Sequence, residues 1–131
     1  MTDTVQKFRD FKENFQKWYF KNYCKSTMKY KDLMPHHQWE IFGWFNDQDI
    51  SLKWGIYEDF FEKAGIYPQV QDCHGHEVFA IDEVDRYHAI CCVRGGKYYA
   101  LSFTNDKKEA RQDAINKAKK LYEELEVLNY L

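Results

Sequence analysis

Apolar residues recur every three or four positions through the first 23 residues, the spacing that places side chains on one face of a helix. Lysines lie between them and would occupy the opposite face. The apolar series is Val5, Phe8, Phe11, Phe15 and Trp18, and the lysines are Lys7, Lys12, Lys17 and Lys21. The pattern therefore predicts an amphipathic helix over residues 4–23.

Two shorter helices are expected next along the chain. Pro35 favours the first turn of a helix, which indicates one helix over about residues 36–45. Ser51 can cap another, and Gly65 can end it because glycine readily adopts a left-handed backbone. QWEIFGWF and KWGIYEDF share the pattern W-x-I-aromatic-x-x-F fifteen residues apart. A duplication and two convergent amphipathic helices both explain this similarity.

After Pro68 the apolar period changes to that of a strand. HEVFAID and KYYALSF alternate apolar and polar residues, and YHAICCV is a β-branched and aromatic run. Gly95 and Gly96 supply the positive backbone angles of a tight hairpin between the last two segments, and an acidic loop, DEVDR, joins the first two. We expect a three-stranded antiparallel meander.

The C-terminal stretch predicts one long helix. Asp106 can cap its start while Glu109 reaches back in a capping box. Its apolar stripe is Ala110, Ala114, Ala118, Leu121, Leu125 and Leu128. This stripe should cover the sheet, because its small early residues allow close packing. The sheet positions expected to be buried against the helix are Val78, Phe79 or Ala80, Ile81, Ile90, Cys92, Leu101 and Phe103.

These elements define a single α+β domain over residues 1–131, since no linker, low-complexity segment or second domain is present in the sequence. Residues 1–50 form a helical N-terminal part. Residues 51–131 hold an α-β-β-β-α unit, at 52–128, in which a three-stranded antiparallel sheet is packed by the long C-terminal helix.

The composition is that of a globular protein rich in rings, with 44% apolar, 31% charged and 18% aromatic residues. No apolar segment is long enough to span a membrane, and the N-terminal residues are charged, unlike those of a signal peptide. The four cysteines lack the spacing of a secreted disulfide framework. We expect a cytoplasmic protein with free thiols and no membrane contact.

Charge is unevenly distributed along the chain. Residues 1–31 carry eight Lys/Arg and three Asp/Glu, residues 32–92 carry three and twelve, and residues 93–131 carry eight and six. A dedicated nucleic-acid-binding domain is usually basic overall. The distribution therefore favours nucleic-acid contacts at the two ends and another partner for the acidic middle, such as a protein that holds nucleic acid.

The last predicted helix opens with KKEAR at residues 107–111 and follows a helix and three strands. In this order residues 52–128 resemble a double-stranded RNA-binding domain, whose second helix begins Lys-Lys-x-Ala-Lys/Arg. The resemblance implies that Lys107, Lys108 and Arg111 lie over the phosphates of an RNA duplex. DEVDR would take the place of the family's minor-groove loop, although its three carboxylates would be repelled by phosphates. The alternative is that the lysines are solvated residues of an ordinary helix.

A second resemblance covers the same part of the chain. WGIYEDFFEKAGI, the strands after it and an alanine-rich terminal helix are similar to small accessory proteins of phages and prophages, some of which are α-β-α sandwiches. The resemblance implies a mobile-element protein that acts in the cytoplasm of a bacterial host cell. Such proteins often block host defences, as anti-CRISPR proteins do.

The helices carry more aromatic residues than one core is expected to hide. Trp39 and Trp44 are five residues apart and cannot share one helix face, and Trp54 and Phe61 lie off the apolar face of the next helix. Tryptophan and tyrosine are enriched at protein interfaces. We expect these four residues to contribute to a protein interface, with burial in the core as the alternative.

Histidines and cysteines cluster around the predicted strands. Cys73, His74 and His76 precede His88 in a region where a zinc site is conceivable. No Cys-x2-Cys pair is present, however, and alternate residues of a strand face opposite ways. No metal and no cofactor are predicted, and metal binding by this cluster stays an open alternative.

Sequence signatures of catalysis are absent. RGGKY lacks the residues that a phosphate-binding loop needs around its Gly-Lys pair. Cys92 and His88, on one face of one strand, are the only thiol and histidine with a local rationale for nucleophilic chemistry. A buried structural cysteine is the commoner situation.

The function expected from these residues and resemblances is a non-enzymatic inhibitory binding protein that docks on an RNA-guided CRISPR effector nuclease with bound RNA. Its acidic middle would face the cationic channel of the nuclease. The expected contacts with RNA phosphates are Lys12, Lys17, Lys21, Lys107, Lys108 and Arg111. A free-standing domain for double-stranded or structured RNA and a small metal- or thiol-dependent enzyme are the alternatives.

Overall fold

A computed structural model describes residues 10–24, 28–72 and 87–129, with side chains as far as residue 124. The described residues form four α-helices, one short 3-10 turn and three strands. In chain order they are α1 (Phe11–Tyr23), η2 (Tyr30–Asp32), α2 (Pro35–Asn46), α3 (Ile50–Lys63), β1 (Ile66–Asp72), β2 (Tyr87–Val93), β3 (Lys97–Thr104) and α4 (Lys107–Asn129). The predicted α+β fold is confirmed, including the α-β-β-β-α order from α3 to α4.

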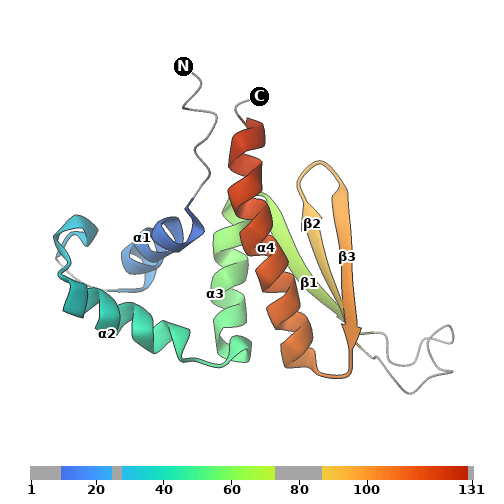
Figure 1. The fold of residues 1–131 in the computed structure, drawn as a ribbon, viewed down its shortest axis with the longest axis horizontal. Helices are drawn as coiled ribbons and strands as arrows, with labels where there is room; N and C mark the ends of the chain where they lie inside the picture. Colours follow the sequence, from blue (N-terminus) through green and yellow to red (C-terminus); the bar gives the residue numbers. More distant parts are fainter. Residues whose placement is uncertain (1–9, 25–27, 73–86, 130–131) are drawn as a thin grey trace, which may run out of the picture.

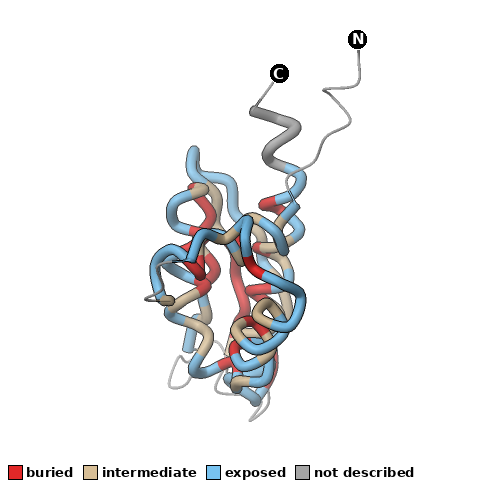
Figure 2. The backbone as a smooth tube through the Cα atoms, turned by 90° about the vertical axis from the view of Figure 1, so that its left-hand side faces the viewer, coloured by how far each residue is buried: buried red, intermediate tan, exposed pale blue. Residues whose placement is uncertain are grey.

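The elements are stacked in three layers (Figure 1). The sheet forms one side, α3 and α4 lie against it in the middle, and α1 and α2 cover the far side of these two helices. In Figure 2 the side that carries α1 and α2 faces the viewer, and buried and exposed stretches alternate along the tube. Each described helix is too short or too polar to cross a lipid bilayer.

The sheet is antiparallel, with the strand order β1-β2-β3. Its first strand is Ile66–Asp72, which the sequence reasoning missed, whereas the predicted strand HEVFAID lies outside the described residues. Pro68 suggested a break because proline cannot donate a backbone hydrogen bond. It is tolerated because β1 is an edge strand, where Pro68 pairs with Cys91 on one side only.

The face of the sheet that meets α4 also differs from the prediction. Ala89 and Cys91 are fully buried in the clusters that include residues of α4, so Ile90 and Cys92 point to the opposite face. On β3 the register shifts, with His88 opposite Phe103 and Ile90 opposite Ala100. The extra residue reverses the alternation of β3, which leaves Phe103 43% exposed instead of buried.

The helices begin and end close to the predicted residues, but some of the capping contacts involve other residues than predicted. Asp49, two residues before the expected cap, caps α3 by accepting from the backbone N–H of Ser51 at 3.2 Å. Asp106 Oδ1 accepts from the backbone N–H of Lys108 at 2.9 Å and caps α4. Gly65, after α3, has φ +78, in the left-handed region that glycine favours. The predicted stripe of α4 is buried as far as it is described, at Ala110, Ala114, Ala118 and Leu121.

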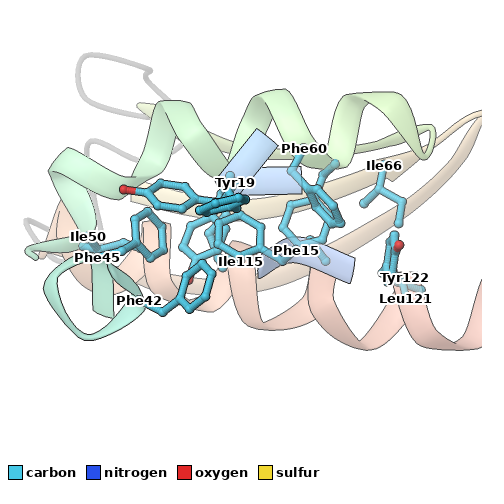
Figure 3. Packing of buried hydrophobic residues seen from close by; sticks show 14 of the residues in the cluster. Phe15, Tyr19, Phe42, Phe45, Ile50, Phe60, Ile66, Ile115, Leu121 and Tyr122 are labelled. Atoms are coloured by element: carbon cyan, nitrogen blue, oxygen red, sulfur yellow. The ribbon is translucent and has the colours of Figure 1, made fainter. Parts of the chain in front are cut away.

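An aromatic core lies between the two helical layers. The ring centres of Phe15 and Tyr57 are 5.1 Å apart, and those of Phe45 and Tyr57 are 5.4 Å apart. These rings come from α1, α2 and α3, and Ile115 and Tyr122 of α4 complete the cluster (Figure 3). The helices are therefore held to one another mainly by stacked and edge-on rings.

Candidate functional site

The most exposed aromatic residues of the described chain lie on α2. This helix buries Phe42 and Phe45 in the core, where they are 4% and 2% exposed. Trp39 and Trp44 are 77% and 57% exposed on the same helix. The core fixes α2 through its two phenylalanines, and the helix in turn presents two tryptophans to solvent.

Both tryptophans line a hollow of about 760 Å³. It was unexpected that they would share one site, because they lie five residues apart. Gly43 also lines the hollow, and no atom lies within 4 Å of the position that a Cβ would take there. The absence of a side chain at Gly43 therefore leaves free space in the hollow. We call this the α2 hollow; its other lining residues are Lys12, Gln16, Pro35, Gln38, Glu40, Phe42, Asn46 and Asp47.

Phe61 and Trp54 are not part of this surface. Phe61 is 0% exposed and stacks on Phe11 with ring centres 5.5 Å apart, so its predicted interface role is wrong. Trp54 is half-buried between the two core clusters. The guanidinium carbon of Arg111 lies 5.7 Å from the centre of its ring. Both side chains are therefore used inside the molecule.

The predicted phosphate contacts at the start of α4 are partly engaged within the chain. Lys107 is exposed. Lys108 Nζ lies 3.3 Å from Asp49 Oδ1, which links the start of α4 to the start of α3. Arg111 lies over Trp54. Of the three cations, Lys107 is the one without such a contact in the described part of the chain.

The three predicted lysines of α1 face different surroundings. Lys12 lines the α2 hollow. Lys17 Nζ lies 3.3 Å from Glu13 Oε1 and 5.8 Å from the centre of the Tyr30 ring. Lys21 borders another hollow, together with Lys17.

This second hollow, which we call the basic hollow, has a volume of about 540 Å³. It is lined by the cations Lys17, Lys21, Lys29 and Lys31 and by Phe20, Cys24, Met28 and Tyr30. Lys29 and Lys31 were not among the predicted contacts, although the lysine-rich run KSTMKYK contains both. The structure brings them beside α1 through the turn at Tyr30–Asp32.

The two sets of predicted cations do not form one surface. Asn14 of α1 donates from Nδ2 to the hydroxyl of Tyr122 at 3.0 Å, which places α1 beside the second half of α4. Tyr122 is fifteen residues after Lys107, or about 22 Å along a helix. The start of α4, with Lys107, therefore lies about four turns of helix from the point where α4 contacts Asn14 of α1.

The histidine and cysteine residues show no metal-binding arrangement within the described residues, where no group of three His, Cys, Asp or Glu comes together. Cys73, His74 and His76 lie outside the described residues. His88 is buried and stacks on Phe103 with ring centres 3.9 Å apart, and burial lowers the pKa of its imidazole.

The suggested thiol–histidine pair is not formed. His88 and Cys92 are four residues apart on one strand, a separation of roughly 13 Å along the backbone. Cys91 is completely buried, and burial raises the pKa of its thiol to about 11. The buried thiol of Cys91 therefore lacks the activated character of a nucleophile.

The chain matches no protein-family model, no curated protein and no solved structure.

Proposed function

We propose that the protein is a non-enzymatic binding protein that docks on a protein partner through the α2 hollow. This proposal rests mainly on Trp39 and Trp44, which are exposed and both line a hollow of about 760 Å³ on a helix anchored in the core. A helix anchored in the core can present two indoles to an apolar side chain of a partner with little loss of conformational entropy.

For the partner we propose an RNA-guided nuclease of a bacterial host, which the protein would inhibit as phage-encoded inhibitors do. This part rests on the resemblance of residues 52–128 to small phage and prophage proteins. The charge pattern is compatible with it, since the acidic residues 32–92 can complement a cationic nucleic-acid channel.

The test is retention of purified RNA-guided nucleases on the immobilised protein, with and without RNase, followed by a cleavage assay. We expect a nuclease to be retained after RNase treatment and to be inhibited. Trp44→Ala should weaken this binding by at least about tenfold while leaving the melting temperature nearly unchanged, because Trp44 is 57% exposed. Full binding by this variant would contradict the α2 hollow as the docking site.

A matched pair of glycine variants provides a sharper control. Gly43 and Gly55 both lie within helices and both have free space around a Cβ. Gly43→Leu should fill the α2 hollow and block binding, whereas Gly55→Leu on α3 should not. Both should fold, since leucine favours helix more than glycine does by roughly 0.8 kcal/mol. Equal loss of binding in both variants would indicate a structural effect.

The basic hollow favours RNA binding as the second candidate function. Four lysines line it together with Tyr30, a combination suited to backbone phosphates and a base stacked on an aromatic ring. Lys29→Glu with Lys31→Glu should then weaken RNA binding and reduce its salt dependence. Unchanged RNA affinity in this double variant would remove the basic hollow as an RNA site.

A further inference from the structure

Lys119 of α4 has an unusual environment for a lysine. The residue is half-buried, and its ammonium lies 5.3 Å from the ring centre of Phe11 and 5.2 Å from that of Tyr57. It forms no ion pair and no hydrogen bond with the described part of the chain. Burial, together with the nearby Lys53, lowers the pKa of Lys119. Lysines removed from water normally have an anionic partner.

Lys119 borders a pocket of about 240 Å³ to which all four helices contribute. Its aromatic walls are Phe11, Phe15, Phe42, Phe45 and Tyr57. Phe15 and Phe45 are among the rings labelled in Figure 3, which shows the core where these helices meet. The pocket thus combines flat apolar walls with two lysines, and Lys119 forms no ion pair within the described part of the chain.

Apart from Lys119, the polar residues that line the pocket are few and belong to α1 and α2. Lys12, Gln16 and Asn46 line it together with Lys119. No carboxylate is among its lining residues in the described chain. Lys53, although not in the lining, adds positive potential close to Lys119. The electrostatic preference of the pocket is therefore for an anion.

These features restrict the chemistry of a ligand. An inorganic anion would satisfy the ammonium and leave the aromatic walls uncovered, and a neutral apolar molecule would desolvate the ammonium without compensating it. The volume equals that of about eight waters at about 30 Å³ each, which limits the ligand to roughly one ring with small substituents. A flat ring with one carboxylate meets all three conditions.

We propose that the pocket between α1, α2, α3 and α4 is a binding site for a small aromatic carboxylate, whose ring lies among the phenylalanines and whose carboxylate accepts a hydrogen bond from the ammonium of Lys119. This site does not depend on the proposed docking function. The two sites share Lys12, Gln16, Phe42 and Asn46 at their boundary, but Gly43, Trp39 and Trp44 belong only to the α2 hollow.

The experiment is calorimetric titration of the full chain with benzoate near pH 7, compared with benzyl alcohol and acetate. We expect saturable one-site binding of benzoate and affinities at least about tenfold weaker for the other two compounds. Lys119→Met should weaken benzoate binding at least about tenfold, since methionine keeps an apolar side chain of similar length. Lys120→Met, at the exposed neighbouring position, should leave it unchanged. Gly43→Leu should also leave it unchanged, which separates this site from the docking surface.

Three results would overturn the proposal. These are the absence of saturable binding with millimolar benzoate, equal affinity for benzyl alcohol, and equal affinity of Lys119→Met. A second measurement on the unmodified chain covers the case in which Lys119→Met does not fold. In NMR spectra, benzoate should then shift the side-chain methylene signals of Lys119 and leave those of the lysines in the basic hollow unchanged. Shifts confined to Lys29 and Lys31 would contradict the proposed pocket.

Discussion

Aromatic residues have opposite roles in this molecule, and their solvent exposure distinguishes these roles. Phe61 is 0% exposed and contacts rings of α1 and α4, whereas Trp39 is 77% exposed. Removing the first leaves a cavity among rigid neighbours, because the surrounding rings come from different helices. Removing the second only uncovers solvent-facing backbone of α2.

The resulting prediction concerns stability. Phe61→Ala should lower the free energy of unfolding by about 3–5 kcal/mol, the range for truncation of a buried phenylalanine. Trp39→Ala should change it by less than about 0.5 kcal/mol. Chemical denaturation followed by circular dichroism measures both values. A loss above about 2 kcal/mol for Trp39→Ala would assign Trp39 to the core and weaken the docking proposal.

At this scale the sequence could identify that some aromatics are exposed, but not which ones. Trp54 and Trp39 occupy the same place in the repeated W-x-I-aromatic-x-x-F pattern. Trp54 is half-buried because α3 lies in the middle layer and meets Arg111 of α4, while Trp39 is on the outer layer. The identical local patterns contain no information about the layer in which each helix lies.

At the scale of elements, the start of α4 is stabilised by a chain of three hydrogen bonds. The hydroxyl of Thr104 accepts from the backbone N–H of Asp106 at 3.1 Å and donates to Glu109 Oε2 at 3.1 Å. Asp106 Oδ1 accepts from the backbone N–H of Lys108. Glu109 therefore reaches the side chain of Thr104, the last residue of β3, instead of the backbone of Asp106 as predicted for a capping box.

These contacts lead to a prediction for the cap. Asp106→Ala should destabilise the fold by about 1 kcal/mol, because it leaves a first-turn N–H of α4 without its acceptor. Asp47→Ala is the matched control, since Asp47 follows α2 and makes its cap contact through the backbone N–H. Equal stability of the two variants by denaturant titration would show that the Asp106 carboxylate is not a cap.

Helices and strands were predictable where the apolar residues followed one regular spacing. The prediction failed where a single residue interrupted that spacing. α2, β2, β3 and α4 match their expected ranges closely, because proline, glycine or aspartate marks their ends. β1 was not predicted because it contains Pro68, and proline is unfavourable inside a sheet. An edge strand such as β1 nevertheless tolerates proline. The bulge of β3 turns Ser102 toward Asp113 of α4, with which it hydrogen-bonds, and a strict alternation cannot anticipate that contact.

At the scale of the whole molecule, packing in three layers removes two ionisable side-chain groups from water, the thiol of Cys91 and the phenol of Tyr57. Burial raises the pKa of Cys91 from 9.0 to about 11 and that of Tyr57 from 10.0 to about 12. Cys91 lies between the sheet and α4, and Tyr57 between the two helical layers. Each group thus reports whether one of the two interfaces between layers is intact.

The sign of the pH effect follows from proton binding. Between pH 9 and 11 the unfolded chain loses the Cys91 proton while the folded chain keeps it, so the free energy of unfolding falls as pH rises. The fall is about 1.4 kcal/mol per pH unit, or about 3 kcal/mol over this window. Tyr57 adds the same effect between pH 10 and 12. Lys119 opposes both, since its lowered pKa makes stability rise with pH below 10.5.

The difference between variants isolates the contribution of each interface. Cys91→Ala lowers stability at neutral pH by truncating a buried side chain, but its stability should change less than that of the unmodified chain between pH 9 and 11. Tyr57→Phe should in turn reduce the decrease between pH 10 and 12. Urea unfolding at half-unit pH steps measures these slopes. Parallel curves for the unmodified chain and Cys91→Ala would mean that solvent reaches the thiol, and that the sheet and α4 are not packed as closely as their full burial of Cys91 requires.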